Sequence, residues 1–235
     1  MFIVRSMISV VIPTLNEERS LASTLTALVP AAVEGLVREV IIVDGGSHDH
    51  TLAIVEEAGC VVVQSAKGRG VQLDEGAKVA KSEWLLFLHA DTVLSEAWMR
   101  EASQFMDSVD CGERPSGAAV FRFALDDIGM KPRLLERLVA LRVAVFRLPY
   151  GDQGLLIPKR LYKEVGGYRP VPIMEDVDLV RRLRRRRILP LHAKAVTSAV
   201  RFKRDGYAFR MMRNVLCQVL FSCRVPHNYI ARLYG

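Results

Sequence analysis

Short runs of β-branched and other apolar residues alternate with amphipathic segments through the first half of the chain. This alternation is typical of βαβ units, in which helices connect parallel strands and cover the sheet. Strands are expected at residues 8–12, 39–43, 60–63 and 84–88. Helices are expected at residues 18–29, where the apolar spacing stops at Pro30, from about residue 52 to Gly59, and at residues 70–81.

The pattern becomes mixed from residue 118 onward. Two further strands are expected at residues 118–125 and 155–157, separated by an amphipathic segment at 132–147 and a loop at 149–154. Helices are expected at residues 159–165, from about 174 to 187, and at 207–221. The whole pattern predicts a single α/β domain with a mostly parallel, Rossmann-like central sheet flanked by helices and a mixed second half.

The composition supports one folded domain. Of the 235 residues, 50% are hydrophobic and 25% are charged, which suits one full core and excludes a disordered chain. Charged residues interrupt every long apolar stretch, so no membrane-spanning segment is expected, and neither is a signal peptide. Four widely spaced cysteines favour free thiols in a cytoplasmic protein over a disulfide scaffold or a zinc site.

The net charge of +7 conceals an asymmetry between the two halves. Residues 1–130 carry 10 basic and 19 acidic side chains, whereas residues 131–235 carry 23 basic and 7 acidic ones. A basic second half indicates an anionic partner, which is a nucleotide diphosphate, a phospholipid surface or nucleic acid. Nucleic acid is not expected, because no aromatic residues interrupt the arginine run at residues 184–187.

Polar side chains follow each of the first four predicted strands. In an open α/β sheet the ligand lies at the carboxyl ends of the strands, so these side chains are expected to meet at one rim. They are Thr14, Asn16 and Glu17 after the first strand, Asp44, Ser47 and Asp49 after the second, Lys67 and Arg69 after the third, and His89 and Asp91 after the fourth.

Asp44 stands at the end of a buried strand, where a carboxylate contributes little to folding. There it is placed to accept a hydrogen bond from a nucleobase or a ribose hydroxyl, so we expect it to bind a ligand. Ser47 and Asp49 are interpreted instead as the cap and the first turn of the next helix. For Thr14 and Glu17, ligand binding and helix initiation are equal alternatives.

The sequence His89-Ala90-Asp91 ends an apolar strand and presents an imidazole and a carboxylate to the crevice. Mg²⁺ or Mn²⁺ needs only one or two protein carboxylates when diphosphate oxygens and water complete its octahedron. Asp91 is therefore the candidate metal ligand. The alternative is that Asp91-Thr92 only forms the start of the next helix. His89 is expected to position other groups, with direct ligation of Mn²⁺ as the lesser alternative.

Glu175, Asp176 and Asp178 open a predicted helix directly before a basic surface. Acidic residues in a first turn also compensate the helix dipole. Carboxylates beside arginines stay ionised, however, and can accept a proton from an incoming hydroxyl, which makes Asp176 the candidate general base. Anion binding is expected at Lys67, Arg69 and the neighbouring glycines Gly68 and Gly70, before a helix N-terminus, and at Arg201, Lys203 and Arg204.

Four motifs in this order resemble those of the family 2 glycosyltransferases with the GT-A fold, over residues 7 to about 190. They are Pro13-Thr-Leu-Asn-Glu17, Val43-Asp-Gly-Gly-Ser-x-Asp-x-Thr51, Phe87-Leu-His-Ala-Asp91-Thr92 and Met174-Glu-Asp-Val-Asp178. The resemblance implies a nucleotide-sugar donor, with a UDP-sugar favoured, an Mg²⁺ or Mn²⁺ cofactor, and a hydroxyl acceptor on a small or lipid-linked molecule. It divides the domain into a nucleotide-binding half at about 7–115, an acceptor half at about 116–200 and a helical tail at about 201–235.

The resemblance also assigns roles to residues. Asp91 is the metal ligand of the family's D-x-D element, and Asp176, with Glu175 beside it, is the base of an inverting transfer. The loop Gly151, Asp152, Gln153 and Gly154 is implied to lie near the donor sugar and the acceptor. The implied nucleotide-binding residues are Pro13, Thr14, Asn16, Glu17, Asp44, Gly45, Lys67, Arg69, His89 and Ala90.

The sequence departs from the family pattern at several positions. His89 and Ala90 replace the first two residues of D-x-D, and Gly45 stands where many members have an aspartate. No Q-x-x-R-W element follows Asp178, so we expect a single sugar addition and not a processive synthase. Two alternatives are a sugar-phosphate nucleotidyltransferase, which the absence of glycine from residues 13–17 disfavours, and a non-catalytic nucleotide-sugar-binding protein, which the pair Glu175-Asp176 disfavours.

Two apolar helix faces, at residues 134–146 and 215–221, have three alternative partners. Packing on the sheet is favoured, because core formation is the usual fate of such faces. A dimer interface and peripheral contact with the inner face of a membrane are the other two. The sequence leaves the oligomeric state open.

Overall fold

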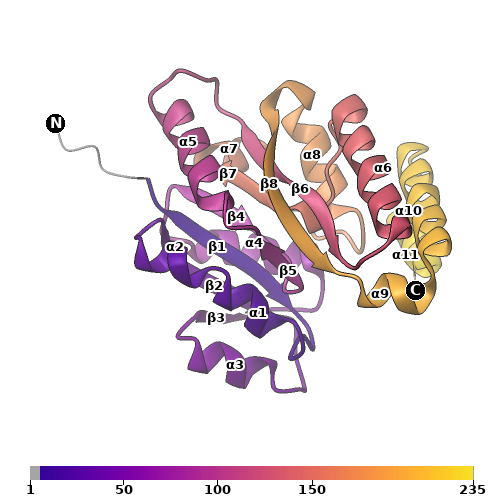
Figure 1. Ribbon diagram of the computed structural model, residues 1–235, viewed down its shortest axis with the longest axis horizontal. Helices are drawn as coiled ribbons and strands as arrows, with labels where there is room; N and C mark the ends of the chain where they lie inside the picture. Colours follow the sequence, from indigo (N-terminus) through magenta and orange to yellow (C-terminus); the bar gives the residue numbers. More distant parts are fainter. Residues whose placement is uncertain (1–5, 235) are drawn as a thin grey trace.

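Eight strands form one sheet in the computed structural model, which describes residues 6–234 (Figure 1). The first residues, 1–5, which belong to the signal-peptide expectation, and Gly235 of the expected tail lie outside the described residues. Along the sheet the order is β3, β2, β1, β4, β7, β6, β8, β5. The strands are β1 (Ile8–Thr14), β2 (Val37–Asp44), β3 (Val61–Gln64), β4 (Trp84–Phe87), β5 (Thr92–Leu94), β6 (Ala118–Asp126), β7 (Leu155–Pro158) and β8 (Ile188–Ser198).

The fold class predicted from the sequence is confirmed. Strands β3, β2, β1 and β4 are parallel to one another, as βαβ units require. The second half is mixed, because β7 pairs antiparallel with both β4 and β6, while β6 pairs parallel with β8. Strand β5 then pairs antiparallel with β8 at the edge.

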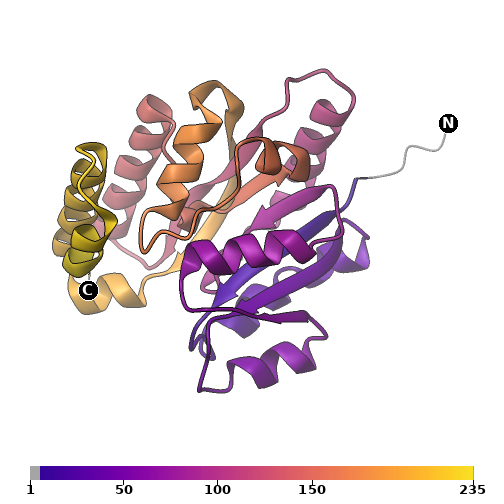
Figure 2. The same ribbon diagram turned by 180° about the vertical axis from the view of Figure 1, so that it is seen from behind.

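Helices cover both faces of the sheet (Figures 1 and 2). One apolar core lies under α1 (Leu21–Thr26), α2 (Val29–Val33), α3 (Thr51–Glu57) and α5 (Trp98–Asp110). The other lies under α4 (Arg69–Val79), α7 (Lys159–Glu164) and α8 (Glu175–Leu183). Beyond the mixed half stand α6 (Met130–Phe146), α9 (Val200–Asp205), α10 (Tyr207–Ser222) and α11 (His227–Tyr234). Within residues 6–234, no helix combines the length and apolar character that crossing a bilayer requires.

Several element boundaries differ from the sequence-based expectation. The helix expected at residues 18–29 is two helices, and Pro30 lies in the first turn of α2, where its missing N–H has no helical partner to lose. The helix expected to reach residue 187 ends at Leu183, because Arg184 adopts a left-handed φ of 63°. The sequence analysis did not identify β5, β8, α5, α9 or α11.

The expectation that both apolar helix faces pack on the sheet is wrong for part of each helix. On α6, Leu135 and Val143 are buried, but Leu134, Leu141 and Val145 are exposed. On α10, Cys217 is buried, while Val215, Leu216 and Val219 are exposed. Each helix therefore carries one apolar side that packs inward and a second that faces solvent.

Helix α4 is held unusually close to the sheet, and this fixes the ends of β1 and β2. A Cβ atom at Gly76 would lie 2.4 Å from Val11 and 2.9 Å from Val43, so only glycine allows this approach. The buried amide of Gln72 donates to the carbonyl oxygens of Thr14 (2.8 Å) and Val43 (2.7 Å). These contacts position the two strand ends from which the predicted nucleotide-binding loops begin.

Candidate active site

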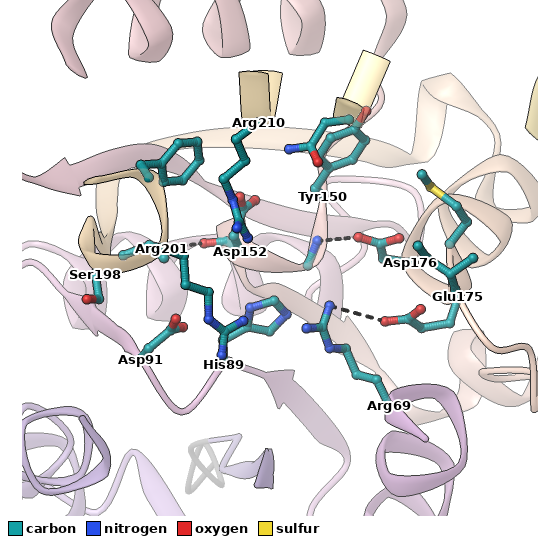
Figure 3. A pocket seen from close by; sticks show the side chains of 16 residues that line it. Arg69, His89, Asp91, Tyr150, Asp152, Glu175, Asp176, Ser198, Arg201 and Arg210 are labelled. Carbon is teal, nitrogen blue, oxygen red and sulfur yellow. Dashed lines mark hydrogen bonds and ion pairs between the residues drawn. The ribbon is translucent and has the colours of Figure 1, made fainter. Parts of the chain in front are cut away.

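A pocket opens beyond the carboxyl end of β4, between the turn after α6 and the start of α8, with α9 and α10 closing the other side (Figure 3). It brings together side chains that are far apart in the sequence. Its acidic, basic and imidazole side chains are those of Arg69, His89, Asp91, Asp152, Glu175, Asp176, Arg201 and Arg210, with Tyr150, Gly151, Ile173, Met174, Thr197, Ser198, Phe202 and Asn214 completing the wall.

Asp44 closes the turn after β2 and is 1% exposed. One carboxylate oxygen accepts hydrogen bonds from the hydroxyls of Ser47 (2.5 Å) and Thr14 (3.2 Å), and the other accepts the backbone N–H groups of Gly46 (2.9 Å) and Ser47 (2.8 Å). Burial raises the pKa of Asp44, but these hydrogen bonds outweigh it and lower the pKa below its ordinary value. The statement that this carboxylate contributes little to folding is therefore wrong, because it organises the whole turn.

Ser47 does not cap the following helix, which corrects the sequence-based interpretation. Helix α3 begins at Thr51 with His50 at the preceding position. The Ser47 hydroxyl instead donates to Asp44 and accepts the backbone N–H of Asn16 (2.9 Å). Asp49 does stabilise the start of the helix, since it accepts the backbone N–H of Thr51 (3.0 Å).

The loop after β1 is tied to the loop after β2. Asn16 adopts a left-handed φ of 56°, and its side-chain oxygen accepts the backbone N–H of His48 (2.9 Å). Glu17 accepts hydrogen bonds from the Ser20 hydroxyl (2.8 Å) and pairs with Arg201 (3.1 Å). Burial raises the pKa of Glu17, with the nearby Asp91 adding to the effect. Glu17 thus connects the β1 loop to α9 at the edge of the pocket.

The segment 67–70 differs from the predicted phosphate cradle. A Cβ at Gly70 would lie 2.3 Å from the carbonyl oxygen of Arg169, so this glycine makes room for protein backbone and not for a ligand. Gly68, with φ of 146°, precedes α4, and Lys67 is exposed outside the pocket lining. Arg69 does reach the pocket, where it pairs with Glu175 at 3.5 Å.

His89 and Asp91 lie together at the carboxyl end of β4, as expected. Burial, with Arg69 and Arg201 nearby, holds the pKa of His89 well below its usual range, so the imidazole is neutral. Its buried Nε2 has no hydrogen-bond partner and lies 2.7 Å from where a Cβ of Gly151 would be. Asp91 projects into the pocket beside it (Figure 3).

The loop from Gly151 to Gly154 contains a 3₁₀ helix, Gly151–Gln153, that the buried side chain of Gln153 stabilises. The Gln153 side chain donates to the carbonyl of Phe121 (2.9 Å) and accepts the backbone N–H of Tyr150 (3.4 Å). Asp152 points into the pocket, and its Oδ1 is buried without a partner. Burial raises the pKa of Asp152 to about 6, against the opposing charge of Arg142.

Asp176 is the second residue of α8, which follows Met174, a residue with a left-handed φ of 65°. One Asp176 oxygen accepts the backbone N–H of Gly151 (2.7 Å) and the other accepts that of Val177 (2.7 Å). The neighbouring Glu175 is 4% exposed, and burial raises its pKa in spite of the opposing charge of Arg69. The candidate base therefore directly follows a residue with strained backbone, Met174, and a buried carboxylate, Glu175.

Asp178 lies outside this pocket and has a structural role. It pairs with Arg182 (2.7 Å) one turn later and with Arg169 (3.6 Å). The motif Glu175-Asp-Val-Asp178 therefore contains two residues that face the pocket and one that fastens the helix to the preceding loop.

The three basic residues predicted near position 200 divide in the same way. Arg201 lines the pocket, whereas Lys203 pairs with Asp127 (2.9 Å) and Arg204 with Asp205 (2.8 Å). The expectation that Lys203 joins the same anion site is wrong, because its ammonium is directed to the loop after β6.

Sequence reasoning missed the contribution of α10. Arg210 is 8% exposed, pairs with Asp205 (2.9 Å) and stacks on Phe202, yet its Nε is buried without a hydrogen-bond partner. One turn later, the side-chain oxygen of Asn214 is also buried and unpartnered. A buried arginine is rare and therefore indicates a site, but its burial is known only from the structure. In the sequence Arg210 belongs to no motif. Tyr150 was missed as well. Its side-chain hydroxyl donates a hydrogen bond to the side-chain oxygen of Gln218 on α10 (2.6 Å).

The predicted site residues thus form two groups. Eight of them line the pocket, and they are Arg69, His89, Asp91, Gly151, Asp152, Glu175, Asp176 and Arg201. The others lie outside its lining, at the β1 and β2 loops, beneath the 151–154 turn or on the surface, and they are Pro13, Thr14, Asn16, Glu17, Asp44, Gly45, Lys67, Ala90, Gln153, Gly154, Lys203 and Arg204.

The donor set suits a metal that takes most of its ligands from substrate. Among residues 6–234 there is no cluster of three or more His, Cys, Asp or Glu side chains able to hold an ion by themselves. Asp91 offers a carboxylate at the pocket wall, and the neutral His89 has a buried Nε2 with no partner. One carboxylate is sufficient for Mg²⁺ or Mn²⁺ when phosphate oxygens and water supply the remainder.

Comparisons with known proteins bear on the family and the fold of this chain. The model of the family described as glycosyl transferase family 2 matches residues 9–129. A PGL/p-HBAD biosynthesis glycosyltransferase of Mycobacterium bovis is 34% identical over 104 residues, which cover 39% of this chain and 38% of that protein. Poly(ribitol-phosphate) β-N-acetylglucosaminyltransferase TarS of Staphylococcus aureus is 30% identical over 106 residues, or 42% of this chain and 18% of TarS. The matches therefore span well under half of these curated relatives.

Solved structures share the fold over nearly the whole chain. Glucosyl-3-phosphoglycerate synthase of Mycobacterium tuberculosis, crystallised with Mn²⁺, UDP and glucosyl-3-phosphoglycerate, has a TM-score of 0.63 and 21% identity, covering 94% of this chain and 81% of that one. TarS of S. aureus has a TM-score of 0.63 and 20% identity, covering 91% of this chain and 65% of that one. At these identities the likeness establishes the common architecture.

Proposed function

Because the chain belongs to glycosyltransferase family 2, we propose that it moves one sugar from a UDP-sugar to an acceptor hydroxyl with inversion at the anomeric carbon. Membership makes the protein a glycosyltransferase, so the nucleotidyltransferase alternative is set aside. The observation that carries the proposal is that Asp91 and Asp176 line one pocket together with Arg69, Arg201 and Arg210. That pocket combines a metal ligand, a base and positive charge for a leaving diphosphate.

The donor nucleoside is assigned to the ends of β1 and β2. Thr14, Glu17 and Asp44 meet there, and hydrogen bonds between the two loops hold them in place. All four acceptor positions of the Asp44 carboxylate are occupied by protein donors. The Thr14 hydroxyl is the farthest of these at 3.2 Å, so it is the donor that a ribose hydroxyl would replace.

The diphosphate is assigned to the pocket between Arg69 and Arg201. Both side chains are close to half exposed, so each is accessible to an anion in the pocket, although Arg69 also pairs with the buried Glu175. Arg201 pairs with Glu17 in the present arrangement, and a diphosphate would compete with that carboxylate for it. Asp91 would hold the divalent ion, with His89 beside it. When bound, the ion neutralises charge that develops on the leaving diphosphate.

Asp176 is assigned as the general base. Its two backbone hydrogen bonds fix the carboxylate and leave one lone pair on each oxygen for a substrate hydroxyl. The acceptor oxygen forms its bond to the anomeric carbon as its proton passes to Asp176, and the bond from that carbon to the UDP oxygen breaks. Removal of such a base typically lowers a rate by about 10²–10⁴-fold.

The acceptor is assigned to the side of the pocket formed by α10 and the 151–154 turn. Asp152 Oδ1, Arg210 Nε and Asn214 Oδ1 are all buried there without hydrogen-bond partners. Unpartnered buried polar atoms are rare in folded proteins, and a substrate that supplies the partners explains them. An acceptor with several polar groups matches this set better than an apolar alcohol.

A thermal-shift panel tests the donor assignment. UDP, GDP, CMP and dTDP are compared with and without Mn²⁺ on the wild type, on Asp91→Ala and on the exposed-site control Asp107→Ala. At about 100 times its dissociation constant a ligand stabilises by about 2.7 kcal/mol, or roughly 5 to 10 °C for a domain of this size. We expect a Mn²⁺-dependent shift with UDP that Asp107→Ala retains and Asp91→Ala loses. An equal shift in Asp91→Ala would refute the metal assignment.

The same panel followed by a turnover assay separates an enzyme from a binding protein. Slow release of UDP from a UDP-sugar in the absence of acceptor is expected of the enzyme. A protein that binds UDP with Mn²⁺ and releases none from any UDP-sugar would support the non-catalytic alternative.

A further inference from the structure

Helix α6 has a second apolar side that faces away from the protein. Leu135 and Val143 point into the molecule. On the other side, residues three and four positions apart form one stripe along the helix. These exposed residues are Met130, Leu134, Leu138, Leu141 and Val145.

Helix α10 repeats this arrangement. Arg210 and Cys217 are buried, and the opposite side of the helix carries another stripe of exposed apolar residues, Phe209, Met212, Val215, Leu216 and Val219. Figures 1 and 2 both show α6 and α10 side by side, at the end of the molecule far from β3. The two stripes together are called the α6–α10 face. Two exposed apolar stripes on neighbouring helices are more than scattered single residues, and extended exposed apolar surface marks an interaction site.

Basic side chains accompany the α6–α10 face. Helices α6, α9 and α10 together contain nine lysines and arginines and only two acidic residues. Two of the nine, Arg201 and Arg210, line the pocket, and three others, Arg133, Lys203 and Arg204, pair with carboxylates. On α6, Lys131 and Arg137 are exposed at positions on either side of the apolar stripe. Long basic side chains can lay their stems on apolar surface and keep their charges at a polar boundary.

This charge selects the partner. A second copy of the chain docking through the same face would bring two basic surfaces together, which is unfavourable. An anionic bilayer offers negative headgroups for the basic residues and an acyl boundary for the apolar stripe, as interfacial helices require.

The strand and loop that lead into α6 run close to the pocket. Ile128, in the loop between β6 and α6, is 96% exposed, and Lys203 pairs with the adjacent Asp127. Asp126 and Ser198, at the ends of β6 and β8, share a surface hollow with Asp91. A surface that contacts Ile128 and α6 therefore lies next to the opening of the pocket.

We propose that the α6–α10 face docks the protein on an anionic membrane surface, with the apolar stripes at the acyl boundary and the flanking basic residues among the headgroups. Docking in this way leaves the transferase reaction unchanged and holds the pocket beside the bilayer. It is independent of the donor and base assignments, because none of the stripe residues lines the pocket.

Vesicle flotation of the full chain tests the proposal. Vesicles of phosphatidylcholine alone are compared with vesicles of three parts phosphatidylcholine to one part phosphatidylserine. We expect the protein to float with the anionic vesicles and to stay at the bottom with the neutral ones. High salt should weaken the binding, because it screens the attraction between basic residues and headgroups.

Matched variants locate the surface. Leu134→Gln, Leu141→Gln and Met212→Gln combined should lower binding at least about ten-fold, whereas Val33→Gln, Val62→Gln and Val79→Gln, exposed valines on α2, β3 and α4, should not. Lys131→Gln with Arg137→Gln should lower it by about 25-fold, and Arg38→Gln with Arg114→Gln should leave it unchanged.

Three results would overturn the proposal. They are no flotation with anionic vesicles, flotation that is insensitive to the α6–α10 variants, and a dimer in sedimentation experiments that the apolar α6–α10 variants dissociate. UDP-sugar hydrolysis is measured without vesicles on the same variants and should match the wild type. A wild type that floats but hydrolyses nothing contradicts the proposed function and leaves membrane docking intact.

Discussion

Replacement of Asp152 by asparagine should stabilise the protein at neutral pH while impairing its reaction. The Asp152 carboxyl is buried, and its Oδ1 has no hydrogen-bond partner. Burial raises its pKa from the ordinary 3.8 to about 6, Arg142 opposes this rise, and the charges of Asp176 and Asp91 add to it. The folded protein therefore holds this proton more tightly than the unfolded chain does.

The sign and size of the effect follow from this difference in pKa. Below about pH 4 the carboxyl is mostly protonated in both states, so its ionisation has little effect on stability. As pH rises toward 6 the unfolded chain releases the proton first, and the free energy of unfolding falls. The rise from 3.8 to about 6 corresponds to about 3 kcal/mol lost once both states are ionised. Asparagine cannot ionise, so Asp152→Asn avoids this loss.

Urea unfolding at about pH 4 and about pH 8 measures the effect on the wild type, Asp152→Asn and the exposed control Asp107→Asn. The stability of Asp152→Asn relative to the wild type should rise by most of that 3 kcal/mol between the two pH values, and Asp107→Asn should follow the wild type. Turnover of Asp152→Asn should fall at both, as expected when a destabilising group serves function. A difference between Asp152→Asn and the wild type that stays constant with pH would refute the reasoning.

Three further predictions concern the site and its supports. Asp176→Asn should lower turnover by about 10²–10⁴-fold while UDP binding, measured by calorimetry, stays unchanged. A smaller fall in turnover would show that Asp176 is not the base. The control Asp178→Asn should lower only stability. Gly70→Ala should destabilise by about 1–3 kcal/mol in urea unfolding, because its Cβ would lie 2.3 Å from a backbone oxygen, and an unchanged midpoint would contradict that packing. Ser47→Ala should lose about 1–3 kcal/mol of stability and weaken UDP binding together, since its hydroxyl links two loops; loss of stability alone would separate the turn from the donor site.

The parallel half of the fold and much of the site were predictable from the sequence. Apolar runs ending in polar residues identify buried parallel strands, and parallel strands bring their carboxyl ends to one rim. That rule placed Asp91 at the pocket, and the acidic helix start before a run of arginines pointed to Asp176. The edge of the sheet was harder, because β8 contains Pro190 and alternates with polar residues, so its apolar signal is weak.

Other features depend on contacts that a linear pattern does not contain. Gly70 looked like a phosphate-binding glycine, but the backbone that fills its space comes from residue 169, almost a hundred positions later. Arg210 has no motif and becomes part of the site only because α10 folds back over the 151–154 turn. The helical spacing of apolar residues on α6 indicates that the helix has apolar sides. Which side is buried depends on the elements that pack against the helix, and these are seen only in the structure.

The most direct test of the central claim is the configuration of the sugar released when a UDP-sugar is hydrolysed without acceptor. The common UDP-hexoses carry the sugar in the α configuration, so attack from the opposite face gives the β sugar first. Proton NMR of freshly released glucose, with UDP-glucose, Mn²⁺ and the wild type or Asp176→Asn, distinguishes the anomers before they equilibrate. We predict that β-glucose appears first with the wild type and is nearly abolished in Asp176→Asn. Release of α-glucose first, or equal release by Asp176→Asn, would contradict an inverting transfer with Asp176 as its base.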